Sequence, residues 1–308
     1  MSESSPNRSD RRRVVVIGVS YGTDELAIRF ARRISDSGAA ASVDLVMVDN
    51  SDRADSSDFF ARVQRAHPRT LCLKPPTNLG YFGGASVGLA AYRERGSAPD
   101  WIVVANVDVE FRDPLFWGHL AALEGGAQVG VIAPYIWSTF LRGSTNPLME
   151  RRPSRYRMRF YKLVFRNYYV LNGYELLGVV KNMVTYFVRR RLVAAGAGLG
   201  RQGRDGSGAR GDGEGADQVR TIYAPHGSCI IFSERYFQCG GTLGYPSFLF
   251  GEELFVAETA RRLGLEVVYE PRLKVWHQDH SSTGWLRSRT VASYLGQSAR
   301  YIADTFFR

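Results

Sequence analysis

The chain has 308 residues, enough for one large domain or two small ones, and its 44% hydrophobic content is typical of a globular protein with a substantial core. That composition excludes disorder throughout the chain. The formal net charge is +10, and 36 of the 40 basic residues are Arg. This charge indicates anionic partners such as nucleotide phosphates, nucleic acid or an acidic membrane surface, although an Arg excess can also reflect genome composition.

No segment of the sequence has the features of a secretory signal or a membrane span. Residues 1–13 are polar and basic without a hydrophobic stretch, so we expect a disordered tail there. No run of about 18 uncharged apolar residues occurs. The three cysteines, Cys72, Cys229 and Cys239, lack metal-ligand spacing and cannot all pair. We therefore expect a reducing, cytoplasmic location, with or without peripheral contact to the inner face of the cytoplasmic membrane.

Short apolar runs that alternate with helical patterns predict a parallel α/β sheet at the start of the chain. Residues 14–19 form a continuous apolar run typical of a buried strand, and a helix follows from Asp24 with apolar residues at helical spacing. A second predicted strand at 43–48 completes a βαβ unit. A helix near 59–63 and a short strand at 70–73 extend the same pattern.

A glycine-rich turn at 78–88 follows the third predicted strand. It contains Asn78, Gly83 and Gly84, but it has neither the spacing of a dinucleotide-binding loop nor that of a P-loop. Its small residues would let backbone N–H groups approach a ligand at the start of a helix whose dipole favours phosphate. The alternative is that the glycines serve only a tight turn and close helix packing.

The central stretch is Asn106-Val107-Asp108, which follows the apolar run 101–105. A buried strand that ends in a carboxylate delivers the acid to the carboxyl edge of the sheet, where ligands bind in open α/β folds. Hard divalent cations take one or two protein carboxylates and then substrate phosphates. The pattern is compatible with a metal site, but Asn and Asp at a strand end more often form a simple Asx turn. Farther on, Asp113-Pro114 predicts a helix start, and 129–133 predicts another strand.

Two segments in the middle of the chain differ from the rest. Residues 150–195 interleave Arg and Lys with Tyr, Phe, Leu and Val, which is typical of helices at an anionic membrane interface. A solvated helical hairpin packed on the main domain is an equal alternative, and RNA binding is a third. Residues 196–219 are dominated by Gly, Arg, Asp and Ala, so we expect a disordered loop.

Residues 220–308 return to the α/β pattern. Strands are predicted at 229–232, 265–269 and 273–276, with a short helix from Ser233. Glu252 and Glu253 open a further helix directly behind the apolar turn 248–251. Two adjacent acids at a helix start most often serve only the helix dipole.

The ends of the predicted elements form an ordered series of polar motifs. These are Ser20-Tyr21, Val48-Asp49-Asn50-Ser51, Asn78-Leu79-Gly80 with Gly83-Gly84, Asn106-Val107-Asp108, Gly251-Glu252-Glu253 and Val275-Trp276-His277. Their order and spacing resemble family 2 glycosyltransferases with the GT-A fold, most of all the bacterial rhamnosyltransferase-like and O-antigen branch. The resemblance covers about residues 14–140 and 220–284. It leaves out the basic segment and the glycine-rich loop.

The resemblance implies an α/β fold of the GT-A type, with a mostly parallel central sheet flanked by helices. Residues 14–149 would form the half that binds the nucleotide sugar, and 220–308 the half that binds the acceptor and carries the base. Residues 150–195 would be a basic helical insertion.

The resemblance also implies roles for individual residues. Those lining the nucleotide-sugar pocket would be Ser20, Tyr21, Asp49, Asn50, Ser51, Asn78, Gly83, Gly84 and Asn106. Asp108 would hold Mg²⁺ or Mn²⁺ against the diphosphate, and Asn106 stands where other members carry the first Asp of an Asp-x-Asp motif. His277 matches a late His that approaches the metal or the diphosphate, with His280 as the alternative. Glu253 falls at the position of the catalytic base, with Glu252 as the alternative.

The implied activity is inverting transfer of a sugar from a nucleoside-diphosphate sugar to a hydroxyl group. The acceptor would be a glycan or a lipid-linked saccharide in surface polysaccharide synthesis, and no nucleic acid partner is expected. Two other classes remain open. A nucleotidyltransferase would share a nucleotide-binding half with a metal-binding Asp, and a non-catalytic nucleotide-sugar or membrane-surface binding protein would not need Glu253.

Overall fold

A computed structural model describes most of the chain. The described residues are 13–39, 43–96, 98–124, 126–139, 143–174, 176–177, 218–278 and 288–308. The expectations for the tail 1–12, for residue 175 and residues 178–195 of the basic insertion, for residues 196–217 of the glycine-rich loop and for His280 lie outside them. The chain divides into two compact units, Met1–Arg152 with Arg210–His280 and Pro153–Ala209 with Ser281–Arg308, and each unit is described by itself.

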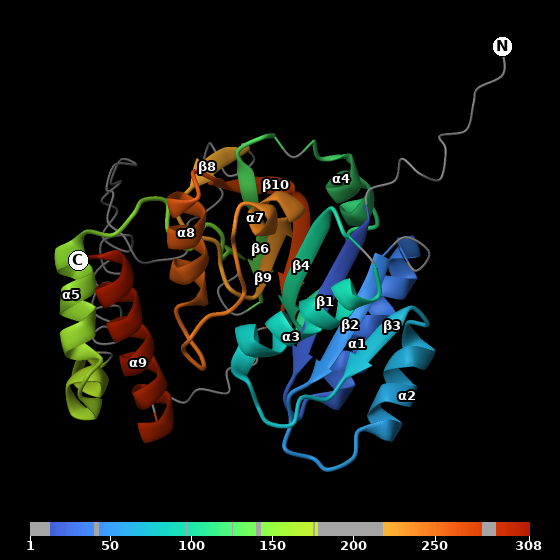
Figure 1. The fold of residues 1–308 in the computed structure, drawn as a ribbon, viewed down its shortest axis with the longest axis horizontal. Coiled ribbons are helices and arrows are strands. Elements are labelled where there is room, and N and C mark those ends of the chain that lie inside the picture. Colours follow the sequence, from blue (N-terminus) through green and yellow to red (C-terminus); the bar gives the residue numbers. More distant parts are fainter. Residues whose placement is uncertain are drawn as a thin grey trace, which may run out of the picture. The chain divides into compact units, whose positions relative to one another are not determined.

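The first unit is built on a sheet whose strands follow the order β3-β2-β1-β4-β9-β6-β10-β5 (Figure 1). The strands are β1 (Val14–Ser20), β2 (Val43–Asp49), β3 (Thr70–Leu73), β4 (Trp101–Asn106), β5 (Val109–Glu110), β6 (Val129–Ser138), β9 (Cys229–Ser233) and β10 (Glu266–His277). Two more strands pair outside this order: β7 (Gly143–Ser144) pairs with β6, and β8 (Arg220–Ile222) pairs with β10. The pairs β3-β2, β2-β1, β1-β4 and β6-β10 are parallel, while β9 runs antiparallel to both its neighbours.

Helices cover both faces of the sheet because alternate side chains of each strand point to opposite faces. The helices of this unit are α1 (Asp24–Ile34), α2 (Ser57–Ala66), α3 (Gly80–Glu94), α4 (Phe116–Ala122), α7 (Glu234–Gln238) and α8 (Glu252–Arg262). On one face, Phe30 of α1, Phe59 of α2 and Phe116 of α4 join a continuous core that includes Val16 and Leu45. Full burial of each ring contributes roughly 1.5–3 kcal/mol.

Helix α3 lies on the other face, and glycine allows its close approach. A Cβ atom at Gly88 would meet Val48, Ile17 and Val46 side chains at 3.1–3.2 Å. A larger residue there would crowd these three side chains of β1 and β2. This arrangement, a mostly parallel sheet between helical layers, confirms the predicted α/β fold class.

Two predicted boundaries were wrong. The helix expected from Asp113-Pro114 begins at Phe116, because the Asp113 carboxylate accepts a hydrogen bond from the Leu115 N–H at 2.9 Å and makes a turn there instead. The strands expected at 265–269 and 273–276 are one strand, β10, whose pairing with β6 shifts register between Glu270 and Lys274.

The second unit contains α5 (Arg155–Val164) and α9 (Arg289–Phe306), which pack against each other. Met158 and Val164 are buried on α5, while α9 buries mainly small side chains such as Ala299 and Ala303. Gly296 lets the helices come close, since a Cβ atom there would lie 2.6 Å from the Phe165 carbonyl oxygen. In the described part of the chain, no helix combines the length and apolar character needed to cross a bilayer.

Candidate active site

The carboxyl ends of three neighbouring strands bring the first predicted site residues to one edge of the sheet. In the parallel registers, Ser20 of β1 pairs with Asp49 of β2, and Val19 of β1 pairs with Asn106 of β4. Ser20, Asp49 and Asn106 therefore end adjacent strands at the same level. In open α/β sheets this is the edge where ligands bind.

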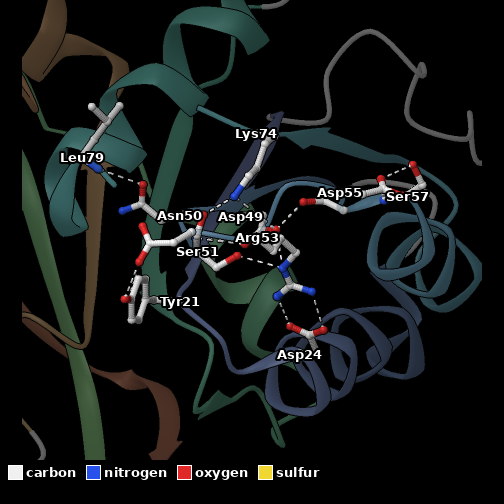
Figure 2. Close-up of polar contacts among 12 residues, drawn as sticks. Tyr21, Asp24, Asp49, Asn50, Ser51, Arg53, Asp55, Ser57, Lys74 and Leu79 are labelled. Atoms are coloured by element: carbon white, nitrogen blue, oxygen red, sulfur yellow. Dashed lines mark hydrogen bonds and ion pairs between the residues drawn. The ribbon is translucent and has the colours of Figure 1, made fainter. Parts of the chain in front are cut away.

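Asp49 is fully buried and its carboxylate is held by the loop that follows it (Figure 2). Oδ1 accepts a hydrogen bond from the Ser51 N–H at 3.1 Å, and Oδ2 accepts one from Ser56 Oγ at 2.5 Å. Arg53 Nε lies 3.0 Å from Oδ2, and its guanidinium forms a bidentate ion pair with Asp24 at the start of α1. Asp49 thus fixes the loop after β2 through several contacts at once.

Asn50 connects the same loop to the glycine-rich turn. Its side-chain oxygen accepts a hydrogen bond from the Leu79 N–H at 3.0 Å, and its amide nitrogen donates to the Gly80 carbonyl at 2.9 Å. Both ends of the Asn50 amide are therefore used to position the start of α3. A Cβ atom at Gly84 would lie 3.0 Å from a methyl group of Val19, so glycine there favours close packing of α3 on β1.

The other predicted pocket residues lie at the rim of this corner. The exposed Tyr21 donates its hydroxyl hydrogen bond to Asp52 at 2.9 Å, and Ser51 Oγ accepts one from Arg53 at 2.8 Å. Asn78 caps the turn by accepting a hydrogen bond from the Gly80 N–H at 3.0 Å. A shallow, open depression beside them is lined by Gly22, Thr23, Asp24, Glu25, Leu26 and Arg53.

Asp108 and His277 come together although 169 positions separate them, because β5 pairs with the end of β10. Val109 is the partner of His277 in that antiparallel ladder, and the Gln278 N–H donates to the Asp108 carbonyl at 3.2 Å. Asp108 Oδ1 then lies 3.2 Å from His277 Nε2. Oδ1 is buried and accepts no hydrogen bond of good geometry from any residue that the structure describes.

This pair fits a divalent cation that is completed by a substrate. Two ligands at right angles around a cation at about 2.1 Å would lie about 3.0 Å apart, close to the separation of Oδ1 and Nε2. Within the described ranges, no group of three or more His, Cys, Asp and Glu side chains is arranged to hold a metal ion. Two protein ligands with phosphate oxygens in the remaining positions match the usual binding of Mg²⁺ or Mn²⁺.

Glu252 and Glu253 begin α8 behind a strained turn. Phe250 and Gly251 both have positive φ, at 70° and 82°, and Phe250 is the one non-glycine residue with positive φ in the described chain. Burial, together with the neighbouring Glu253, raises the pKa of Glu252 to about 8. Burial also raises the pKa of Glu253, while the N–H groups of Glu253 and Gly227 oppose that shift. Strain of this kind persists where the surrounding structure holds a functional geometry.

The structure adds Tyr81, His226 and Gly227 to the site, none of which we predicted from the sequence. Tyr81 donates its hydroxyl hydrogen bond to the Gly227 carbonyl at 3.2 Å. A Cβ atom at Gly227 would lie 2.6 Å from Glu253 Oε1, so the Glu253 carboxylate rests directly on this backbone. The His226 ring lies 6.1 Å from the His277 ring, centroid to centroid. One feature of the sequence could have indicated these residues: Gly227 lies in a polar turn just before the apolar strand β9.

Tyr81 also shows how closely the acidic groups gather. Burial raises the pKa of Tyr81 well above its usual value, and neighbouring acidic groups add to the shift. These groups are Cys229, Glu252, Asp108 and Glu253. Tyr81, at the start of the helix that Asn50 positions, and Glu253 thus both contact Gly227, and the charges of Asp108 and Glu252 also reach the tyrosine.

No family model matches this chain, and no curated protein matches it. Solved structures do match. GalNAc-T7 with UDP, GalNAc and Mn²⁺ has a TM-score of 0.50 at 8% identity, over 88% of this chain and 44% of that one. The mannosyltransferase PcManGT from Pyrobaculum calidifontis, in complex with GDP-Man and Mn²⁺, has a TM-score of 0.49 at 12% identity. The match covers 95% of this chain and 70% of that one. Residues 1–349 of S. aureus TarS, in complex with UDP-GlcNAc, have a TM-score of 0.49 at 10% identity. The match covers 89% of this chain and 60% of that one.

The chain spans less than two thirds of GalNAc-T7 and of the TarS fragment. At these identities the likeness concerns the fold. The strand order, the parallel β3-β2-β1-β4 half and the match to GalNAc-T7 agree with the fold that the sequence motifs implied. The first unit of this chain therefore has the GT-A-type fold of glycosyltransferases.

Proposed function

We propose that the protein is an inverting glycosyltransferase that moves a sugar from a nucleoside-diphosphate sugar to an acceptor hydroxyl. The observation that carries the proposal is that Glu253 rests on the Gly227 backbone, while the ring of the adjacent His226 lies 6.1 Å from the ring of His277, the partner of Asp108. An inverting transfer needs positive charge at the departing diphosphate and a base at the acceptor. Asp108 and His277 would hold the cation that provides the positive charge, and the two glutamates would provide the base.

Asp108 and His277 would hold a divalent cation against the diphosphate of the donor. The cation would stabilise the negative charge that develops on the leaving group. The corner formed by Tyr21, Ser51 and Asn78 would receive the nucleoside. Asp49 and Asn50 act there through the loops that they fix, since their side chains are already used within the protein.

Glu253 is the proposed base. The acceptor oxygen attacks the anomeric carbon, the bond from that carbon to the phosphate oxygen breaks, and the diphosphate departs with the electron pair. The proton of the acceptor hydroxyl passes to the Glu253 carboxylate. A placed base of this kind typically contributes about 10²–10⁴-fold.

The two adjacent carboxyl groups suit this division because their surroundings differ. Glu252 is 6% exposed, and its pKa of about 8 keeps it protonated at neutral pH. Glu253 is more exposed and has the Gly227 N–H beside its carboxylate. Burial raises the pKa of both carboxyl groups, and the Gly227 N–H opposes that shift at Glu253.

The motif resemblance supports a finer assignment to family 2 and to its rhamnosyltransferase-like branch, with a glycan or lipid-linked saccharide as the acceptor. GDP-Man, UDP-GlcNAc and UDP with GalNAc occur in the structures of similar fold. These compounds and dTDP-sugars form a reasonable first donor panel.

The test is release of nucleoside diphosphate from that panel, with Mn²⁺ or Mg²⁺ and with or without saccharide acceptors. We expect one donor to be consumed faster when acceptor is present, and NMR of the product to show inversion at the anomeric carbon. Retention would contradict the mechanism. Donor binding without turnover would indicate a binding protein, and formation of a nucleotide sugar from a nucleoside triphosphate and a sugar phosphate would indicate a nucleotidyltransferase.

A further inference from the structure

Helix α5 of the second unit exposes three large apolar side chains on one face. Tyr156, Phe160 and Leu163 follow each other at spacings of four and three residues, which places them along one side of the helix. Their exposed fractions are 67%, 48% and 68%. Arg159 lies on the same side and is exposed as well. The buried side chains of α5 are Met158 and Val164.

The apolar surface continues beyond the helix. Tyr169 and Val170 are 71% and 51% exposed, and the Tyr174 ring lies 5.9 Å from the Phe160 ring. Of the 13 large hydrophobic side chains that are exposed in the described part of the chain, eight lie between residues 156 and 177. Scattered exposed apolar residues are normal, but a concentration in one short segment marks an interaction surface. We call residues 155–170 of this segment the α5 face.

The charge on this unit is strongly one-sided. Its described residues include eight Arg and Lys side chains and one acidic side chain, Asp304. Asp304 forms an ion pair with Lys162, in which Asp304 Oδ1 lies 2.5 Å from Lys162 Nζ. Arg155, Arg159 and Arg166 are exposed along the α5 face. A partner with complementary charge must therefore be anionic.

We infer that the α5 face binds the surface of an anionic lipid bilayer. Aromatic rings favour the headgroup level, aliphatic side chains favour the acyl boundary, and Arg side chains pair with lipid phosphates. The exposed aliphatic side chains Leu163 and Val170 favour lipid over nucleic acid as the partner. RNA bases can stack on aromatic side chains but form few favourable contacts with aliphatic ones. Each basic residue near an anionic surface strengthens binding about fivefold.

Co-sedimentation of the full chain with vesicles tests the inference. The vesicles are phosphatidylcholine alone and a two-to-one mixture of phosphatidylcholine with phosphatidylglycerol. We expect binding to the mixture that weakens as salt rises, and no binding to phosphatidylcholine alone. The charge variant combines Arg155→Glu, Arg159→Glu and Arg166→Glu, and should bind at least about 100-fold more weakly. The apolar variant combines Tyr156→Ser, Phe160→Ser and Leu163→Ser, and should lose at least about tenfold.

Matched controls lie on the first unit. Arg32→Glu, Arg33→Glu and Arg65→Glu make the same change in net charge on exposed positions of α1 and α2, and Leu115→Ser with Val219→Ser removes exposed apolar groups elsewhere. Both controls should bind like the parent. Circular dichroism should show that all variants keep the parent helix content.

Several results would overturn the inference. They are equal binding by the charge variant and its control, equal binding to both vesicle types, and tighter binding of single-stranded RNA or polyglutamate than of vesicles. Absence of vesicle binding, with self-association that the apolar variant abolishes, would make the face an interface between copies of the chain. The inference goes beyond the proposed function and does not depend on it, since no donor or acceptor enters the assay.

Discussion

Glu252 and Glu253 are neighbours in the chain but meet different surroundings, and this difference predicts different effects of the same substitution. Glu253→Gln keeps the size and hydrogen bonding of the side chain but removes its basicity. We predict that kcat falls at least about 100-fold while donor affinity changes little. Glu252→Gln, the matched variant, should affect substrate binding more than the chemical step. Steady-state kinetics with the identified donor measures both.

The assignment of the base can fail in two ways. If Glu253→Gln turns over normally and Glu252→Gln is inactive with donor still bound, the two roles are reversed. If both variants turn over normally, neither carboxylate accepts the proton, and the mechanism is wrong.

The raised pKa of Glu252 also makes stability depend on pH. Its usual value is 4.5, and burial with the nearby Glu253 brings it to about 8. The stabilising contribution of this protonated carboxyl is present below about pH 4.5 and is lost as the pH rises through about 8. We therefore predict that Glu252→Gln raises Tm, relative to the parent, more at about pH 9 than at about pH 5.

Differential scanning calorimetry in the presence of chelator measures this difference. Glu94→Gln, at an exposed position at the end of α3, is the control and should shift Tm equally at both pH values. The same ΔTm for Glu252→Gln at both pH values would show that the native carboxyl does not hold its proton.

The turn before α3 and the turn before α8 meet at Gly80, which links the nucleotide corner to the acidic one. Gly80 has φ of 73°, and a Cβ atom there would lie 2.0 Å from the Phe248 carbonyl oxygen. Gly96 has φ of 74° but no atom within 4 Å of the same position, so Gly96→Ala measures the backbone strain alone.

We predict that Gly80→Ala lowers the free energy of unfolding by at least about 2 kcal/mol more than Gly96→Ala does. The reason is that the 248–251 turn must move away from α3. Urea unfolding of the two variants gives the difference, and donor affinity should fall in Gly80→Ala alone. Equal losses in both variants would mean that the two turns are not in close contact.

The elements that carry the first half of the site could be predicted from the sequence. Ser20, Asp49 and Asn106 each end or directly follow a predicted strand, and the carboxyl ends of parallel strands meet at one edge. The structure confirms those strands. The sequence also indicated that Asp108 ends a strand, but not that β5, only two residues long, would carry it to His277.

The contacts that could not be predicted join distant segments. The hydrogen bond from Tyr81 to Gly227 spans 146 residues, and neither residue belongs to a periodic pattern. The continuity of β10 was hidden by Pro271, since proline inside a run usually ends a strand; here it lies at the register shift. Local patterns specify elements, while side-chain contacts between elements depend on packing that a single sequence does not show.

The second unit of the chain also depends on packing between elements that local sequence patterns do not show. Helix α9 was absent from our sequence predictions because the side it buries is made of Ala and Ser with few large apolar residues. Gly296 and those small side chains allow α9 to pack on α5, and this pairing makes the two helices a compact unit of their own. The charge and exposed apolar surface of the chain are concentrated there, while the candidate chemistry lies in the first unit.

The central claim, that the first unit binds a nucleotide sugar through a cation at Asp108, is tested most directly by isothermal titration calorimetry. The donor panel is titrated into the parent, Asp108→Ala and the control Asp36→Ala, with Mn²⁺ and with chelator. We predict that one nucleotide sugar binds the parent and the control at least about tenfold more tightly with Mn²⁺, a difference of about 1.4 kcal/mol, and that Asp108→Ala shows no such gain. Equal affinity of Asp108→Ala and the parent in both conditions, or no binding of any nucleotide sugar to the parent, would contradict the account.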